Sequence, residues 1–237
     1  MESPLHILPP ALRTHVRRRL ARLTRPAWLG TLHRTTPLSD HWGFERGTPI
    51  DRHYIWRFLD AHRGDIHGHV LEVKDSAYVD MFGGAVTRVD VLDIDRTNSG
   101  ATIVADLCAA DAIPSDEFDC IVLTQTLQFT FDVTAAIGHV HRMLRPGGVL
   151  LTTVPSITKT DRVLVNQDYW RFTMATCRRL FGDRFGSEQV EVDSYGNVLT
   201  AVAFLMGMAE EELSLDELET RDDRFPVLIS VRAVKAA

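Results

Sequence analysis

Short apolar runs alternate with helical stretches along the chain after Gly68. The runs that predict strands are HVLEV (69–73), VTRVDVLDID (86–95), ATIVAD (101–106), FDCIVLTQ (118–125), GVLLTTVP (148–155), QVEVDSY (189–195) and FPVLISVRAV (225–234). Two clear helical stretches lie between them, FDVTAAIGHVHRML (131–144), followed by an RPGG turn, and TMATCRRLFGDRF (173–185). Near-continuous apolar strands alternating with helices are typical of a mostly parallel sheet covered on both faces. The pattern therefore predicts a doubly wound α/β fold.

The first 63 residues follow a different pattern. ALRTHVRRRLARL (11–23) and IDRHYIWRFLDAHRGD (50–65) each carry apolar residues at helical spacing, and the loop-like stretch TTPLSDHWGFERGTP (35–49) lies between them. The helical positions are Leu12, Val16, Leu20 and Leu23 in the first stretch and Ile50, Tyr54, Ile55, Phe58 and Leu59 in the second. We expect an N-terminal helical arm over residues 1–63 and a core over residues 64–237.

Charge and composition narrow the classes of function. The net charge of −6 argues against general nucleic-acid binding, although residues 1–63 hold eleven arginines and only five acidic residues. This basic arm could meet phosphate, a membrane surface or an acidic substrate, or form a solvated helix face. The chain has neither an apolar run long enough to span a membrane nor a secretory leader pattern, so we expect a cytoplasmic protein.

The sequence gives no sign of a metal centre. The three cysteines, Cys108, Cys120 and Cys177, form no CxxC pair, which favours neither a disulfide framework nor a zinc site. No cluster of histidine and acidic residues has metal-ligand spacing either, so we expect no bound metal.

Polar residues end four successive predicted strands. In doubly wound sheets ligands bind beyond the carboxyl ends of the strands. These end positions are Glu72, Asp93 with Asp95, Asp106, and Thr124 with Gln125. Asp93 follows Glu72 by 21 residues, close to the spacing at which a carboxylate holds a ribose hydroxyl pair in nucleotide-binding folds. The pattern predicts a nucleoside-binding cleft, with Asp106 placed to accept from an adenine amino group.

Several motifs in this core carry a family resemblance. They are VLEV (70–73), VLDID (91–95), ADL (105–107), FDCIVLTQTLQF (118–129) and LRPGGVLLTTVP (144–155). With these motifs the stretch 68–155 resembles the class I S-adenosylmethionine-dependent methyltransferases of the type 11-like group. The resemblance implies a Rossmann-like sheet of seven strands and S-adenosylmethionine as cofactor. DYWRFT (168–173) also resembles a segment of the small-molecule methyltransferases.

The resemblance also implies roles for individual residues. The implied cofactor-binding set is Glu72, Lys74, Asp93, Asp95, Asp106, Leu107, Thr124, Gln125 and Gln128. Glu72 would organise the first loop, and Lys74 could reach the methionine carboxylate. Asp93 would hold the ribose hydroxyls, with Asp95 and then Asp90 as alternatives. Asp106 and the Leu107 amide would bind adenine, and the last three residues of the set would line the pocket near the sulfonium.

The chain departs from the family in its first loop. Lys74, Ser76 and Tyr78 stand where the family has glycines. Glycine there permits positive φ angles and close approach of the backbone to the cofactor. Asp75 and Ser76 can form local turns without glycine. The sequence leaves open whether the cofactor site is retained.

Methyl transfer depends chiefly on positioning the acceptor against an activated methyl group, although a hydroxyl acceptor also needs a base. The candidate catalytic residues are His53, Tyr54, Asp168 and Tyr169, and the candidate substrate residues are Arg46, Trp170 and Arg171. The aromatic residues near position 170 could instead anchor a loop on the core. His139 and His141 lie on a helix expected to cover the sheet away from the cleft, which favours a structural role.

We therefore expect a methyltransferase that acts on a small molecule, with O-methylation of a sugar or natural-product intermediate as the first hypothesis. Alternatives are a non-catalytic binding or scaffold protein and another S-adenosylmethionine-assisted reaction on the same fold. A dehydrogenase is disfavoured because no GxGxxG follows the first strand. The acidic segment 206–225 could be a lid, a contact in a homodimer, or a solvated helix and loop.

Overall fold

The computed structural model of the chain describes residues 9, 12, 16, 30 and 33–237. Contacts divide the chain into two compact units, residues 1–36 and 37–237. The helix expected over 11–23 falls almost wholly outside the described residues. Residues 37–63, which we had assigned to the arm, belong to the second unit, because the apolar stripe of helix α2 (Ile50–Ala61) is buried in the same core as strands of the sheet.

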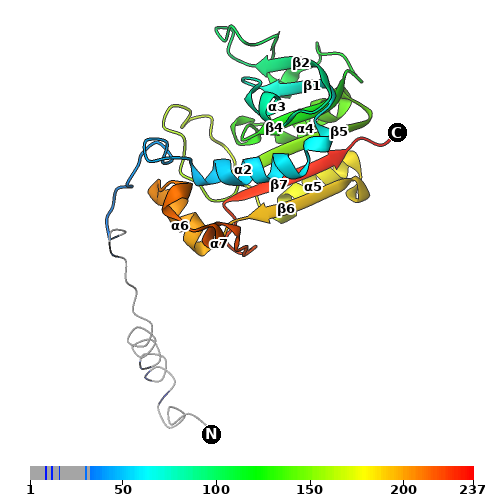
Figure 1. Cartoon of the computed structure of the whole chain (residues 1–237). Helices are drawn as coiled ribbons and strands as arrows, with labels where there is room; N and C mark the ends of the chain where they lie inside the picture. The colour runs from blue at the N-terminus through cyan, green and yellow to red at the C-terminus, as the bar shows by residue number, and fades with distance from the viewer. Residues whose placement is uncertain (1–8, 10–11, 13–15, 17–29, 31–32) are drawn as a thin grey trace. The chain divides into compact units, whose positions relative to one another are not determined.

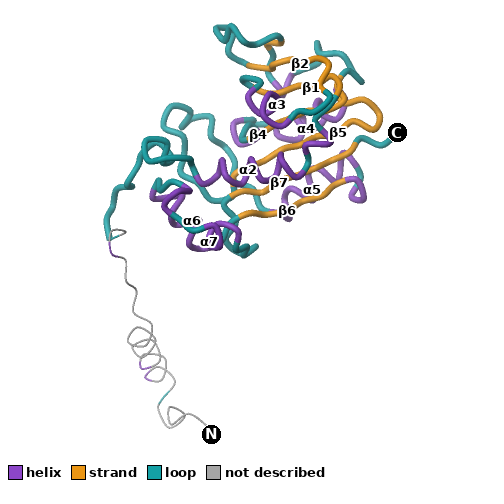
Figure 2. Tube along the Cα trace, in the orientation of Figure 1, coloured by secondary structure: helices purple, strands orange, loops and turns teal. Residues whose placement is uncertain are grey.

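The second unit is built on one seven-stranded sheet with the order β3-β2-β1-β4-β5-β7-β6 (Figures 1 and 2). The strands are β1 (Gly68–Val73), β2 (Val86–Asp93), β3 (Ile103–Val104), β4 (Phe118–Thr124), β5 (Leu144–Pro155), β6 (Val190–Tyr195) and β7 (Leu228–Val234). β1 to β5 pair in parallel, whereas β7 is antiparallel to both β5 and β6. The predicted seven-stranded, mostly parallel, Rossmann-like sheet is confirmed.

Helices cover both faces of the sheet. The described α-helices after α2 are α3 (Ala77–Phe82), α4 (Val133–Met143), α5 (Met174–Phe185), α6 (Val198–Met206) and α7 (Leu215–Glu219). Short 3-10 helices are η3 (Arg63–Asp65), η4 (Leu107–Ala109), η5 (Leu127–Phe129), η6 (Ser187–Gln189) and η7 (Glu210–Glu212). One apolar cluster joins α4 and α5 to the sheet, and a second joins α2, α3, α6 and α7 to its other face. In Figure 1, α2 lies along β7.

One local prediction is wrong and two need shorter bounds. RPGG does not form a turn before β5, because β5 already begins at Leu144 and contains a bulge opposite β4. Gly147 has a φ of +80°, and a side chain on Gly148 would collide with backbone oxygens of Phe118 and Arg145. The strand expected over 101–106 shortens to β3, and the helix expected over 50–65 ends at Ala61.

Helix α6 was not predicted. Its sequence, VLTAVAFLM, has no charged residue, so it shows no polar face from which a helical period could be recognised. Asn197 begins the helix with a capping box shared with Thr200, and Gly207 ends it in the left-handed conformation. Within the described residues, no helix combines the length and apolarity needed to cross a membrane.

Candidate cofactor and active site

Glu72 is a buried carboxylate near the end of β1. Only 2% of the residue is exposed, and its two oxygens accept hydrogen bonds from the backbone amides of Tyr78 (3.1 Å) and Val79 (2.8 Å) at the start of α3. Burial raises the pKa of this carboxyl to about 7, against the lowering effect of the two backbone hydrogen bonds. Glu72 therefore ties the end of β1 to the loop and helix that follow it.

The raised pKa of Glu72 predicts a pH-dependent stability. A carboxyl whose pKa is about 7 in the folded chain and near 4.5 when unfolded binds protons more tightly in the folded state. Its favourable contribution is present below pH 4.5 and is lost as the pH rises to about 7, a loss of about 3 kcal/mol. Urea unfolding of the wild type and Glu72→Gln measures this loss. Between pH 4.5 and 8, the free energy of unfolding of the wild type should fall by about 3 kcal/mol relative to that of the variant. A pH-independent difference would contradict this assignment.

The first loop takes the shape that a glycine would favour at one of its three substituted positions. Lys74 has a φ of +77°, in the left-handed region, whereas Ser76 has a φ of −108° and Tyr78 lies inside helix α3. A left-handed conformation costs a non-glycine residue roughly 1–2 kcal/mol. The Lys74 amide donates to the carbonyl of Leu92 at 2.9 Å, which keeps the loop beside the end of β2. The glycine-poor loop thus retains its turn, with backbone strain at one residue.

Asp93 ends β2 with an oriented carboxylate. Its Oδ1 accepts from the Asp95 amide (3.0 Å), and its Oδ2 accepts from the side-chain amide of Asn98 (2.7 Å). Each carboxylate oxygen can accept a second hydrogen bond. Asp93 therefore offers two further acceptor positions, the number that a ribose hydroxyl pair requires. Sequence reasoning missed Asn98, because TNSG (97–100) indicates only a turn.

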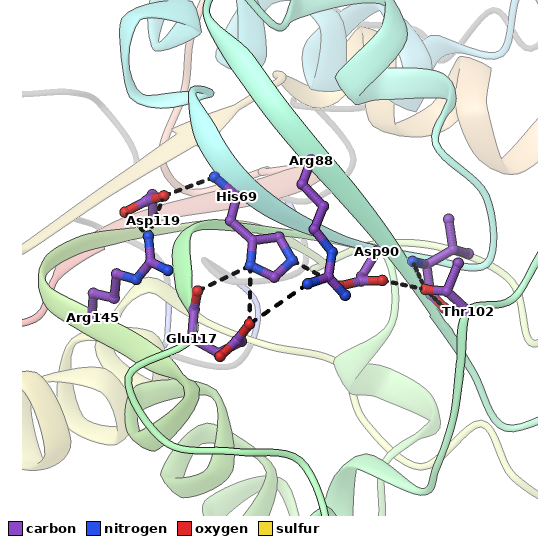
Figure 3. Close-up of polar contacts among 8 residues, drawn as sticks. His69, Arg88, Asp90, Thr102, Glu117, Asp119 and Arg145 are labelled. Atoms are coloured by element: carbon purple, nitrogen blue, oxygen red, sulfur yellow. Dashed lines mark hydrogen bonds and ion pairs between the residues drawn. The ribbon is translucent and has the colours of Figure 1, made fainter.

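Asp95 and Asp90, the alternatives for the ribose role, are engaged elsewhere. Asp95 Oδ1 accepts from the amide (2.8 Å) and the hydroxyl (2.7 Å) of Thr97, and these hydrogen bonds lower the pKa of Asp95. Asp90 is 5% exposed and accepts from Thr102 Oγ1 (2.8 Å), His69 Nε2 (2.7 Å) and Arg88 (2.9 Å; Figure 3). Both side chains serve local structure in these contacts.

The network around His69 lies toward the amino ends of the strands. His69 Nδ1 contacts the Glu117 carbonyl at 3.1 Å, and the His69 amide donates to Asp119, which also pairs with Arg145 (Figure 3). Burial alone would raise the pKa of Asp90, but its hydrogen bonds from Thr102 and His69 outweigh this and lower it. The network joins β1, β2, β4 and β5 on the side away from the strand-end carboxylates.

The adenine candidates follow β3. Asp106 begins helix η4, and its Oδ1 accepts from the Cys108 amide at 2.8 Å. Leu107 is buried in the core shared with α4. These contacts fix the backbone of the segment after β3 and leave the second oxygen of Asp106 as an acceptor.

The segment after β4 holds a buried polar atom without a partner. The Gln128 side-chain amide donates to the Gln125 carbonyl at 2.9 Å, so its Oε1 faces away from that carbonyl. Gln128 Oε1 is buried and has no hydrogen-bond partner among the described residues. Gln125 has a φ of +46°, and its amide donates to the Thr153 carbonyl. Because buried polar atoms are normally paired, Gln128 Oε1 is a candidate acceptor for a ligand. Thr124 is the last residue of β4, the strand that precedes this segment.

The loop after β5 is fastened to this segment. The amides of Tyr169 and Trp170 both point to the Gln128 carbonyl, at 2.8 and 3.3 Å, and the Trp170 indole donates to Thr130 at 3.0 Å. The Tyr169 ring, 44% exposed, packs edge-on against Phe131. Tyr169 and Trp170 therefore anchor the loop and still present aromatic surface at its rim.

Asp168 and Arg171 form an ion pair within the same loop. Asp168 accepts from the Arg171 guanidinium (2.8 Å) and from the Asp161 amide (3.0 Å). Burial would raise the pKa of Asp168, but these hydrogen bonds lower it. Arg171 donates further to the Lys159 carbonyl at 3.0 Å. This pair shapes the loop, which is a different use of Asp168 from the catalytic role that we had assigned to it.

His53, Tyr54 and Arg46 meet the acidic segment 206–225. His53 contacts Glu210 through Nδ1 and Glu219 through Nε2, both at 3.0 Å. The buried Tyr54 hydroxyl donates to the carbonyl of Leu218, in α7, at 3.0 Å, and Arg46 pairs with Glu212. The acidic segment is therefore bound to α2 and its preceding loop, and the hydrogen bonds of these three candidates run to it rather than to the strand ends. Among the described residues, no group of three or more histidine, cysteine or acidic side chains is arranged to hold a metal ion.

Comparisons with known proteins bear on the domain and the fold. Residues 72–152 match the family model of the methyltransferase domain. No curated protein matches the sequence significantly. Among solved structures, an S-adenosylmethionine-dependent methyltransferase from Mesorhizobium loti is 19% identical with a TM-score of 0.54, covering 78% of this chain and all of the other.

Two further structures share the fold. The Haloferax volcanii complex of the Trm112 methyltransferase activator with a methyltransferase matches at 18% identity and a TM-score of 0.53, covering 79% of this chain and 92% of that chain. The [4+2]-cyclase SpnF matches at 14% identity and a TM-score of 0.50, covering 87% of each chain. Residues 72–152 therefore match the methyltransferase-domain family, and the chain shares the fold of S-adenosylmethionine-dependent methyltransferases.

Proposed function

We propose that the protein transfers a methyl group from S-adenosylmethionine to a small molecule, with the hydroxyl of a sugar or natural-product intermediate as the first acceptor class. This proposal rests on the geometry of Asp93 at the end of β2. Two donors hold its carboxylate, and each oxygen keeps one free acceptor position. Asp93 lies within the segment that matches the methyltransferase domain. Two charge-assisted hydrogen bonds to a ribose would fit these positions.

The remaining residues supply orientation. S-adenosylmethionine brings a methyl group on a sulfonium, so the chain needs to align the acceptor with it. Asp106 would accept from the adenine amino group, and the unpartnered Gln128 Oε1 would accept from an N–H or O–H of the bound molecules. The exposed rings of Tyr169 and Trp170 would form one wall for the acceptor.

A cyclisation reaction on the same fold is a second candidate function. The similarity to the [4+2]-cyclase extends over 87% of this chain, and the glycine-poor first loop departs from the usual family pattern. A protein of this class would use the same fold without consuming S-adenosylmethionine.

Incubation with methyl-tritiated S-adenosylmethionine and separate panels of sugars, phenols and amines distinguishes these functions. We expect S-adenosylhomocysteine to form only when an acceptor is present, and to form fastest with the sugars or the phenols, whose acceptor is a hydroxyl. Asp93→Ala should lose this product. Label transferred only to amines would correct the acceptor class. Binding of the cofactor with no transfer to any panel would contradict the methyltransferase proposal.

A further inference from the structure

We propose that Asn98 is a positioning residue that holds the glycine-poor first loop and the Asp93 carboxylate in the arrangement needed for cofactor binding; this inference rests on the proposed function. Asn98 lies in the turn after β2, beyond the strand-end positions at which ligand-binding residues are expected. Its side chain joins the first loop, which precedes β2, to the carboxylate of Asp93 at the end of β2.

The Asn98 side chain is fully engaged in this connection. One N–H of its amide donates to the Lys74 carbonyl at 2.7 Å and the other to Asp93 Oδ2 at 2.7 Å. Its Oδ1 accepts from the Gly100 amide at 2.9 Å. Two acceptors face the amide nitrogen and one donor faces the oxygen, so the orientation of the amide group follows from its surroundings.

The first loop needs this support because it lacks glycine. Lys74 has a φ of +77°, a conformation that glycine adopts without a steric penalty and lysine does not. In this conformation the Lys74 carbonyl lies within reach of Asn98. A hydrogen bond made in the strained conformation favours that conformation over any in which the bond is broken. Asn98 thereby compensates for the glycine that the family has at position 74.

The same side chain orients Asp93. The side-chain amide of Asn98 and the backbone amide of Asp95 each occupy one acceptor position, on opposite oxygens of the Asp93 carboxylate. Rotation of the carboxylate would break at least one of these bonds. Asn98 is neutral, so it fixes the direction of the two free acceptor positions without neutralising the charge of Asp93. A preorganised acceptor pair binds a diol more tightly than a rotating one.

Four variants test this role by calorimetric titration with S-adenosylhomocysteine: Asn98→Ala, Asn98→Asp, Lys74→Gly and the double variant Lys74→Gly with Asn98→Ala. Asn98→Ala should weaken binding about tenfold to a hundredfold, because a hydrogen bond to a charged group is lost together with the loop contact. Asn98→Asp retains the shape but has no donor, so its affinity should fall at least as far. Gln189→Ala removes an exposed amide at the opposite end of the sheet and should change nothing.

The double variant separates positioning from a general structural role. Lys74→Gly serves as its own reference, because it also removes a side chain of the cofactor-binding set. Asn98→Ala should weaken binding less in the Gly background than in the Lys74 background, because glycine keeps the left-handed turn unaided. Equal losses from Asn98→Ala in the Lys74 and Gly backgrounds would overturn the link to the loop. Unchanged affinity in Asn98→Ala, or a loss that follows the melting temperature alone across the variants, would overturn the positioning role.

Amide hydrogen exchange over residues 74–80 tests the loop without any ligand. Asn98→Ala should speed exchange at the Tyr78 and Val79 amides, which donate to Glu72 in the wild type. Adding Lys74→Gly should restore their protection. If the wild type does not bind S-adenosylhomocysteine but Asn98→Ala still loosens the loop, the proposed function fails while the connection made by Asn98 stands. Unchanged exchange would overturn that connection.

Discussion

Replacing Asp93 with alanine is expected to weaken the binding of S-adenosylhomocysteine about a hundredfold. Each ribose hydroxyl would donate to one oxygen of this carboxylate, and two hydrogen bonds to a charged acceptor contribute about 3 kcal/mol together. The carboxylate is already held by Asp95 and Asn98, so its orientation is established before the ligand arrives. The loss should therefore fall on affinity, with the folded structure retained.

Calorimetric titration of Asp93→Ala beside Asp95→Ala checks this expectation. The Asp95 side chain binds Thr97, and the backbone amide that it offers to Asp93 survives the substitution. Asp95→Ala should cost less than about a fifth of the effect of Asp93→Ala on the binding free energy. A larger loss in Asp95→Ala would transfer the ribose role to Asp95, and unchanged affinity in Asp93→Ala would remove Asp93 from the site.

Replacing Asp90 with alanine is expected to lower the free energy of unfolding by about 3–5 kcal/mol. Removing a buried acceptor leaves each of its buried donors without a partner, at about 1–3 kcal/mol each. The first donor is His69, which is 6% exposed and whose Nε2 lies 2.7 Å from Asp90 (Figure 3). Thr102 also loses its acceptor, whereas the exposed Arg88 can turn to solvent and contributes little.

Urea unfolding of the wild type, Asp90→Ala and the milder Asp90→Asn measures this effect. Asp90→Asn should fall between the other two, because its amide oxygen can still accept from one partner. The affinity for S-adenosylhomocysteine should stay unchanged in Asp90→Asn, since the network lies toward the amino ends of the strands. A loss below about 1 kcal/mol in Asp90→Ala would place this contact among weak surface pairs.

The fold was largely readable from the sequence because each central strand is buried on both faces. β4 has a near-continuous apolar run that ends at Thr124, and in β1 the polar Glu72 stands directly before the last residue, Val73. The errors arose where local pattern and tertiary contact diverge. The bulge in β5 depends on the close approach of Gly148 to the backbone of β4, and α6 has apolar side chains on its exposed side as well as on its buried side. Neither feature has a periodicity of its own.

Candidate site residues could be predicted from the sequence only where they lie at the ends of strands. Glu72, Asp93 and Asp106 could be named because the carboxyl ends of parallel strands meet at one edge. The partners of other candidates could not, because they are distant in sequence. Examples are His53 with Glu210 and Glu219, and Asn98 with Lys74. Whether the glycine-poor loop keeps its turn depends on backbone angles, which the sequence does not give. Of the three substituted positions, only Lys74 lies in the left-handed region.

We propose that this chain retains a cofactor site despite its glycine-poor first loop. The decisive measurement is calorimetric titration of the wild-type protein with S-adenosylhomocysteine, with Asp93→Ala titrated in the same way. We expect saturable binding of one ligand per chain that Asp93→Ala weakens strongly. The absence of any binding heat at millimolar ligand, for a wild-type protein that is folded, would contradict it.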